Sequence, residues 1–259
     1  MNPVIAVDIG NTNTDIGMID TRLMKCADRL TVASGSSDKT IATAILTIIK
    51  KSTAPSGLIC LSSVDKARLK ALVAAIKKTT GLACSVVHLH KNLPIKINYQ
   101  NPSVLGADRI ADALYASKKY PGKDVIVIDS GTTITVDIID RTGTFKGGAI
   151  IPGILTQLHS MHTGTVALPQ INTLENKSVL PGTSTRECMV AGVKTGLAGA
   201  MNALVAAYQK QYKNRAIVLA CGGGWSCHTD GIDFKFKFVP DLTLVGTALY
   251  GCCCGCDTV

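Results

Sequence analysis

A short polar turn occurs twice in the chain, each time after an apolar run. Residues 4–14 read Val-Ile-Ala-Val-Asp-Ile-Gly-Asn-Thr-Asn-Thr, and residues 125–135 read Val-Ile-Val-Ile-Asp-Ser-Gly-Thr-Thr-Ile-Thr. At one constant offset, the first copy's Asp8, Gly10, Thr12 and Thr14 match Asp129, Gly131, Thr133 and Thr135. Glycine lets a backbone approach a ligand closely, and successive N–H groups can bind phosphate oxygens. A single copy would be read as an ordinary hairpin turn, whereas the duplication predicts two turns that clamp a polyphosphate.

The acidic residue of the first turn needs a partner other than phosphate, because like charges repel. Asp8 is therefore expected to hold Mg²⁺, directly or through water, since carboxylate oxygens are ligands of that ion. Asn11, Thr12 and Thr14 add short neutral donors to the same turn. In the second copy, Asp129 and the hydroxyls after Gly131 would supply the facing half of the clamp.

An acidic and a basic residue stand side by side at Asp108 and Arg109, after Gly106. An alcohol that attacks a phosphoryl group needs a proton acceptor, which a carboxylate can be. An arginine can bind an anionic substrate group through two parallel hydrogen bonds. The alternative is a helix that begins with a favourably placed Asp and carries a surface Arg, and spacing alone leaves both interpretations open.

Two glycine-rich segments lie further along the chain. Residues 147–153 read Gly-Gly-Ala-Ile-Ile-Pro-Gly, and Gly222 to Gly224 follow an apolar run. Either segment could bring its backbone close to a nucleotide, or could be a plain loop or a sharp turn between strand and helix.

Other reactive residues are read as structural. His88 and His90 would share one face of a strand, but no third metal ligand is evident. The cluster from Cys252 to Cys256 matches no zinc-binding spacing, and the ten cysteines are expected to be reduced, buried thiols.

Composition narrows the class of protein. Hydrophobic residues make up 46% of the 259 residues and charged residues 17%, as in a globular protein. The net charge of +9 suits anionic ligands such as ATP, while 4% aromatic residues and dispersed lysines disfavour nucleic acid as the partner. No signal peptide and no apolar run of bilayer length are recognised, so we expect a cytoplasmic protein without a membrane partner.

The elements that must position these residues alternate between strand and helix. Each turn is expected to close a β-hairpin. Further strands are predicted at 58–62, 84–89 and 215–220, and helices at 39–51, 65–80, 106–119, 186–211 and 243–251. This alternation indicates an α/β fold, and the long repeat indicates two similar domains. We place the first, with the first turn and the Asp108 segment, at residues 1–117 and the second at 123–259.

Together these motifs resemble the type III pantothenate kinases, which belong to the superfamily of actin, chaperone ATPases and sugar kinases. Residues 8–12 resemble the family's Asp-x-Gly-Asn-Thr, and the most specific match is Tyr99 to Arg109 with Tyr-x-Asn-Pro-x-x-x-Gly-x-Asp-Arg. Residues 147–153, 182–185 and 241–244 fall where the family has further motifs. The resemblance implies two duplicated actin-like (ribonuclease H-like) domains with a nucleotide cleft between them.

The resemblance also implies roles for individual residues. Asp108 would be the general base on the pantothenate hydroxyl, and Asp129 would hold a monovalent cation, K⁺ or NH₄⁺. Pantothenate would be bound by Tyr99, Gly106, Ala107, Asp108, Arg109 and Thr185. ATP would be bound by Asp8, Ile9, Gly10, Asn11, Thr12, Asn13, Thr14, Asp15 and Thr132. A homodimer is implied, in which Thr185 could come from the other subunit.

The chain departs from the family pattern in three places. Thr133 replaces an alanine and Ile134 a threonine in the second turn, and Ser184 replaces an asparagine. We expect transfer of the ATP γ-phosphoryl group to pantothenate, the first step of coenzyme A biosynthesis. The alternatives are a kinase for another small hydroxylated acid, and a nucleotide-binding regulatory protein of the same fold.

Overall fold

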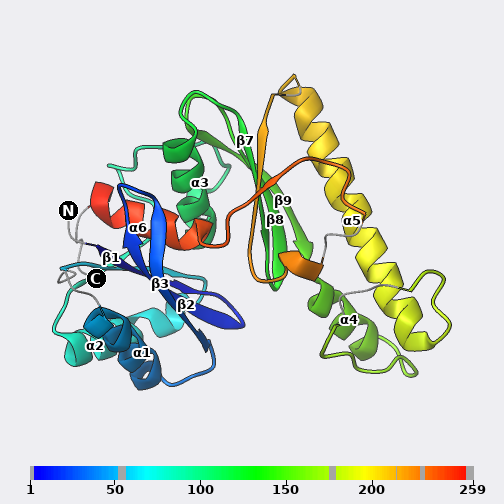
Figure 1. Cartoon of the computed structure of the whole chain (residues 1–259), viewed down its shortest axis with the longest axis horizontal. Helices are drawn as coiled ribbons and strands as arrows, with labels where there is room; N and C mark the ends of the chain where they lie inside the picture. The colour runs from blue at the N-terminus through cyan, green and yellow to red at the C-terminus, as the bar shows by residue number, and fades with distance from the viewer. Residues whose placement is uncertain (1–2, 52–56, 175–178, 214, 228–230, 255–259) are drawn as a thin grey trace. The chain divides into compact units, whose positions relative to one another are not determined.

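A computed structural model of the chain describes residues 3–51, 57–174, 179–213, 215–227 and 231–254 (Figure 1). The chain forms two compact units. The first unit comprises Met1–Gly122, Arg141–Phe145 and Asp241–Val259, and the second comprises Lys123–Asp140 and Lys146–Pro240.

The first unit is built on a five-stranded sheet in the order β3-β2-β1-β4-β5. Its strands are β1 (Val4–Ile9), β2 (Asn13–Asp20), β3 (Lys25–Ala33), β4 (Ile59–Ser63) and β5 (Cys84–Val86). Strand β2 runs antiparallel to β1 and to β3, whereas β4 runs parallel to β1 and to β5. Because β1 and β4 are buried along nearly their whole length, they read as continuous apolar runs.

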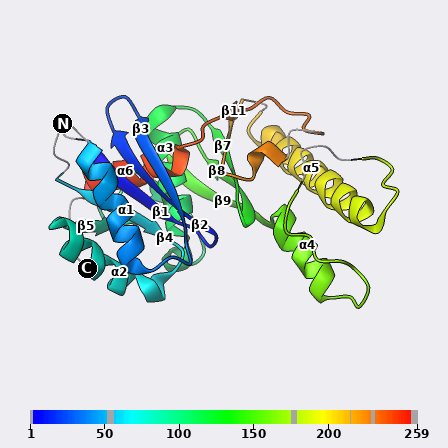
Figure 2. The same cartoon turned by 60° about the horizontal axis from the view of Figure 1, so that its bottom comes forward.

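Helices cover both faces of this sheet (Figures 1 and 2). Helices α1 (Asp38–Lys51) and α2 (Lys66–Thr80) bury Ile45 and Leu72 in one core with Ile5 and Val7 of β1. On the other face, α3 (Ala107–Lys119) packs against α6 (Leu242–Cys254), which also contacts β1 and β4. A short 3₁₀ turn, η1 (Pro102–Val104), precedes α3.

The second unit repeats the arrangement of strands. Its strands are β7 (Val125–Ser130), β8 (Thr133–Ile139), β9 (Thr144–Pro152), β10 (Ile217–Cys221) and β11 (Lys237–Phe238). They follow the order β11-β10-β7-β8-β9 in a six-stranded sheet whose last strand is β6 (Lys96–Ile97). Again the first strand is central, the second pairs with it antiparallel, and the fourth pairs with it parallel. Strand β9 begins in the first unit, where Thr144 and Phe145 pair with β6 (Lys96–Ile97).

Helices α4 (Ile154–Thr163) and α5 (Thr185–Gln211) complete the second unit. By length and composition α5 could cross a membrane, a test that core helices of globular proteins also pass. The expectation that no apolar run reaches bilayer length is therefore wrong for this helix. Met189, Leu197 and Met201 of α5 are buried in one core with Ile126 of β7, so the helix is an integral layer of this unit.

The duplicated α/β architecture agrees with the prediction, and the predicted hairpins form at both turns. The division of the chain is different from the predicted two consecutive domains. The second unit begins at Lys123 as expected, but Asp241–Val259 belongs to the first unit because α6 packs on α3 and β1. Strand β3 and helix α4 were not predicted.

Candidate functional site

The first turn, between β1 and β2, is closed by its own backbone. The N–H of Gly10 donates to the carbonyl of Asn13 over 3.0 Å, and Asn11, Thr12 and Asn13 are exposed. Asp8 is half-buried at the end of β1. The exposed backbone of the turn can therefore reach a ligand, with a carboxylate at its base.

Of three other residues of the predicted ATP set, two are buried and one is half-buried. Ile9 is buried in the core of the first unit, so only its backbone can contact a ligand. Thr14 is fully buried, and its hydroxyl lies 3.0 Å from the Ser34 hydroxyl. Asp15 accepts a hydrogen bond from Thr31 and pairs with Arg29 over 3.0 Å. These side chains support the turn from within the sheet.

Asp108 lies in the first turn of α3, after the helix N-cap Gly106. Its Oδ1 accepts a hydrogen bond from the backbone N–H of Arg109 over 2.8 Å. A Cβ added to Gly106 would overlap this Oδ1, so only glycine at position 106 permits the observed carboxylate position. The half-buried carboxylate is thus held in one orientation, as a proton acceptor requires. Ala107, between the two residues, is buried.

Arg109 is buried rather than on the surface, with 6% of its area exposed. Its guanidinium carbon lies 5.7 Å from the ring centre of Tyr99 and 5.3 Å from that of Phe145. The two rings meet edge to face at 6.0 Å. This arrangement rules out the alternative of a surface arginine, and the aromatic faces stabilise the buried cation.

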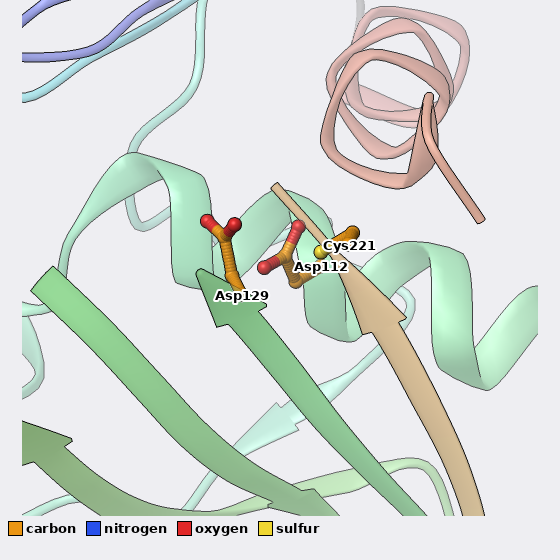
Figure 3. A group of neighbouring side chains, drawn as sticks. All are labelled: Asp112, Asp129 and Cys221. Carbon is orange, nitrogen blue, oxygen red and sulfur yellow. The ribbon is translucent and has the colours of Figure 1, made fainter. Parts of the chain in front are cut away.

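Two residues near this segment were missed in the sequence. The ring of Phe145 packs against the Arg109 guanidinium, but the two residues are too far apart in the sequence to belong to one short motif. Asp112, on α3, is 1% exposed and accepts a hydrogen bond from Thr243 of α6 over 2.8 Å (Figure 3 shows its carboxylate). Its spacing of one helical turn from Asp108 could have signalled it, because residues at i and i+4 share a helix face.

The second turn, between β7 and β8, is closed by a hydrogen bond from Gly131 N–H to the carbonyl of Thr133 over 2.9 Å. Thr132 and Thr133 are exposed. Ile134 is fully buried in the core of the second unit, so the family threonine that it replaces would point into that core here. Asp129 is half-buried at the end of β7, in register with Cys221 of β10 (Figure 3).

Both glycine-rich segments pack against the second turn. The N–H of Gly153 donates to the carbonyl of Thr132 over 2.9 Å, and that of Gly224 to Ser130 over 2.8 Å. A Cβ at Gly153 or Gly222 would overlap backbone of the turn, and at Gly222 also the Asp129 carboxylate. Gly222 further has φ of +88°, which side-chain-bearing residues rarely adopt. These segments are therefore close-approach backbones and not plain loops.

Thr185 is the exposed first residue of α5. Ser184 caps this helix by accepting from the N–H of Glu187 over 3.2 Å, and Glu187 accepts in return from Thr183. The hydrogen bond from the Thr183 N–H lowers the pKa of the Glu187 carboxyl. Serine thus serves this N-cap well in place of the family asparagine.

The histidines and cysteines that were interpreted as structural differ in burial and in contacts. His88 Nδ1 lies 3.1 Å from the Tyr250 hydroxyl and 2.8 Å from the carbonyl of Val86. The described cysteines form no disulfides, but Cys188, Cys252 and Cys253 are exposed, so the expectation of buried thiols is wrong for these three. Cys256 lies outside the described residues.

A comparison with known families decides the identity of the fold. The pattern of the family described as type III pantothenate kinase matches residues 4–207. The chain belongs to this family. Type III pantothenate kinases of Listeria welshimeri and Persephonella marina are each 29% identical to it. The alignment with the Listeria protein covers 95% of both chains, and that with the Persephonella protein covers 94% of this chain and 96% of the relative.

Solved structures show the same fold at low sequence identity. A ROK family glucokinase from Streptomyces griseus, solved with glucose and AMPPNP, is 15% identical, with a TM-score of 0.52 over 95% of this chain and 98% of its own. The ethanolamine utilization protein EutJ from Carboxydothermus hydrogenoformans is 14% identical, with a TM-score of 0.54 over 96% and 89%. The predicted family, the phosphotransferase class and the duplicated actin-like fold are confirmed. The roles of individual residues stay predictions.

Proposed function

We propose that this family member transfers the γ-phosphoryl group of ATP to the primary hydroxyl of pantothenate, giving 4′-phosphopantothenate. The observation that carries the proposal is the oriented Asp108 carboxylate beside the buried Arg109. A base and an anion-binding cation on neighbouring residues suit a substrate that carries both a hydroxyl and a carboxylate.

In this proposal Asp108 accepts the proton of the pantothenate hydroxyl as its oxygen attacks the γ-phosphorus of ATP. The bond between the γ-phosphorus and the bridging oxygen breaks, and ADP leaves. Arg109 binds the pantothenate carboxylate, with Tyr99 beside it and the backbone of Gly106 and Ala107 exposing the helix start to the substrate. Because phosphoryl transfer depends chiefly on positioning and charge neutralisation, fixed side chains of this kind supply much of what it needs.

The first turn would bind phosphate groups of ATP through the backbone of Gly10 to Asn13 and the hydroxyl of Thr12. Asp8, half-buried at the base of this exposed turn, offers the hard oxygen ligands that Mg²⁺ takes, directly or through water. The ion would neutralise phosphate charge there.

The second turn would contact ATP through Thr132. Asp129 suits a monovalent cation, K⁺ or NH₄⁺, because its carboxylate lies against the bare backbone that Gly222 provides, where carbonyl oxygens can add ligands. The cation would supply positive charge near the phosphates. A cytoplasmic homodimer, in which the exposed Thr185 reaches a neighbouring subunit's substrate, completes the proposal.

The deciding experiment is ADP release by the purified protein with Mg²⁺ and K⁺, measured with and without pantothenate. We expect release to depend on pantothenate and to match the 4′-phosphopantothenate formed, as measured by mass spectrometry. Dependence on a different hydroxylated acid in a substrate panel would favour another acceptor. ATP binding without release in the presence of any acceptor would favour a regulatory protein.

A further inference from the structure

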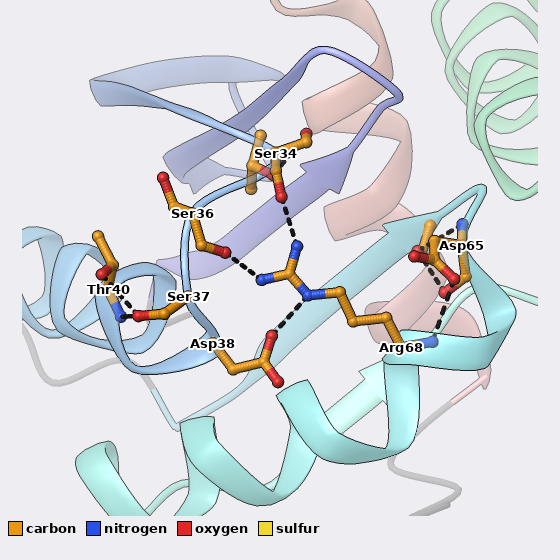
Figure 4. A network of polar contacts seen from close by, with 9 residues as sticks. Ser34, Ser36, Ser37, Asp38, Thr40, Asp65 and Arg68 are labelled. Atoms are coloured by element: carbon orange, nitrogen blue, oxygen red, sulfur yellow. Dashed lines mark hydrogen bonds and ion pairs between the residues drawn. The ribbon is translucent and has the colours of Figure 1, made fainter.

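Arg68 of α2 makes an unusually complete set of contacts with one loop of the first unit (Figure 4). Its Nε donates to Asp38 Oδ1 over 2.6 Å, and its two terminal nitrogens donate to the carbonyls of Ser34 and Ser36. The side chain is 25% exposed. The planar guanidinium thus fixes two points of the loop between β3 and α1 and the first residue of α1, which a lysine ammonium could not do with the same geometry.

The same loop holds the first phosphate turn from the other side. The N–H of Ser34 donates to the carbonyl of Thr12 over 2.9 Å, and the Ser34 hydroxyl lies 3.0 Å from that of Thr14. Thr14 is fully buried and Ser34 is 8% exposed, so the bond between their hydroxyls is shielded from water. Ser34 therefore stands between Arg68 and the turn, bonded to both.

The N-terminal ends of α1 and α2 have their own capping hydrogen bonds. Ser37 begins α1 by accepting from the N–H of Thr40 over 3.1 Å, and Asp65 caps α2 by accepting from the N–H of Arg68 over 3.1 Å. Both helix starts are therefore stabilised without the Arg68 guanidinium. Its loss would free the middle of the loop while leaving the two helices in place.

We propose that Arg68 is a positioning residue for ATP binding, which acts through Ser34 to hold Thr12 and Thr14 in the conformation that receives phosphate. The proposal rests on the ATP-binding role proposed above for the first turn. The hydrogen bonds of the Arg68 side chain go to Asp38, Ser34 and Ser36, so its role would be to order the backbone that binds phosphate. Binding to a turn that is already ordered costs less entropy than binding to one that must be ordered by the ligand.

The test compares Arg68→Ala, Arg68→Lys and the control Lys51→Ala. Lys51, the last residue of α1, forms an ion pair with Asp28 over 3.2 Å in the same unit. Like Arg68→Ala, the control therefore removes a paired cation from a helix of the first unit. Direct ATP–Mg²⁺ binding is measured by calorimetry without pantothenate. We expect the Kd for ATP to rise roughly 3- to 10-fold in Arg68→Ala, less in Arg68→Lys, and not in Lys51→Ala.

Steady-state kinetics separate positioning from general damage. The KM for ATP should rise in Arg68→Ala while the KM for pantothenate stays within about twofold of the parent. Ser34→Ala keeps the backbone bond to Thr12, so it should raise the KM for ATP by a smaller factor and again leave the KM for pantothenate nearly unchanged. This variant replaces Arg68→Ala in the test if Arg68→Ala does not fold. Equal loss of affinity for both substrates, or unchanged ATP binding in folded variants, would overturn the proposal. A parent protein that binds ATP but releases no ADP would refute the proposed kinase function and would leave the proposed role of Arg68 in ATP binding intact.

Discussion

The orientation of Asp108 depends on the absence of a side chain two residues earlier. A Cβ at Gly106 would overlap the carboxylate oxygen that accepts from the Arg109 N–H. The glycine of this motif therefore leaves the space that the observed carboxylate of the candidate base occupies, and a Cβ there would force the carboxylate to shift. It is not needed for backbone freedom, because Gly106 has an ordinary φ of −61°.

We expect Asp108→Asn to bind both substrates and to lose about 10²- to 10⁴-fold in kcat, because an amide cannot accept the hydroxyl proton. Stopped-time assays of 4′-phosphopantothenate, with ATP and pantothenate affinities measured in parallel, test this. Asp28→Asn, which alters a half-buried carboxylate of β3 that pairs with Lys51, is the matched control. Near-parental turnover of Asp108→Asn would remove this residue from the mechanism.

Cys26 provides a pH-dependent test of the first unit. Burial, reinforced by the negative charge of Asp241, raises the pKa of its thiol to about 11. At pH 8 only about 0.1% of the thiol is then ionised, so iodoacetamide should label Cys26 far more slowly than the exposed Cys188. Because the thiolate forms only as pH rises toward 11, labelling of Cys26 should quicken about tenfold from pH 8 to pH 9. Peptide mapping measures both rates, and equal rates at pH 8 would contradict the expectation.

The position of a candidate site residue could be predicted from the sequence where the residue belongs to a short local motif. Asp8, Asp108 and Asp129 stand in short motifs, and each lies at an element end as expected. Ser34, Arg68 and Phe145 could not be found in this way. Each acts by contacting a residue that is far away in the chain, and only the folded structure brings such pairs together.

At the scale of elements, the packing of α3 on α6 depends on Gly246. A Cβ there would overlap the backbone carbonyl of Ala111, which cannot move without displacing α3. The two helices therefore approach closely, and α3 is the helix that carries Asp108 at its start. The position of the candidate base is thus tied to the final helix of the chain.

Gly246→Ala should destabilise the first unit by about 1–3 kcal/mol or more, since overpacking at a backbone contact forces the helices apart. Gly192→Ala in α5 is the control, because nothing lies within 4 Å of the added methyl group. That change should be neutral or stabilise by up to about 1 kcal/mol. Urea denaturation followed by circular dichroism measures both, and equal effects would show that the α3–α6 contact can relax.

Elements with a strong period or a good cap were predicted almost to their ends, as with α1 and α2. Strand β3 was missed because its sequence, Lys-Cys-Ala-Asp-Arg-Leu-Thr-Val-Ala, does not alternate polar and apolar residues, although exposed and half-buried positions alternate along the folded strand. Helix α4 was missed because it follows Pro152 and Gly153, which read as a loop. Its start is fixed instead by contact of Gly153 with the second turn.

At the scale of the whole molecule, the repeat is the feature that the sequence predicted best. β1 and β7 start and end at equivalent residues, and the two sheets share one strand order. The return of the last segment to the first unit could not be predicted, because α6 is apolar on nearly all sides and carries no mark of which sheet it covers.

The unequal chemistry of the two copies leads to a prediction about cations. If Asp129 holds a monovalent ion, activity in ammonium-free buffer should rise with K⁺ and should not rise with the same concentration of Na⁺. Asp129→Asn should lose this dependence, while Asp124→Asn, another acidic residue of the second unit, should keep it. Activity of the parent protein that does not change with either K⁺ or Na⁺ would count against a cation at Asp129.

The interrupted course of the first unit has a consequence for protein synthesis. Its sheet is complete once residue 86 has been made, yet α6, which covers β1 and β4, is encoded after Asp241. On the ribosome the part of the sheet that α6 covers therefore stays exposed while the entire second unit is translated, although α3, which contacts β4, has already been made. Messages truncated before Leu242 should yield chains that bind chaperones and are degraded, even though both phosphate turns and the Asp108 segment have already been made.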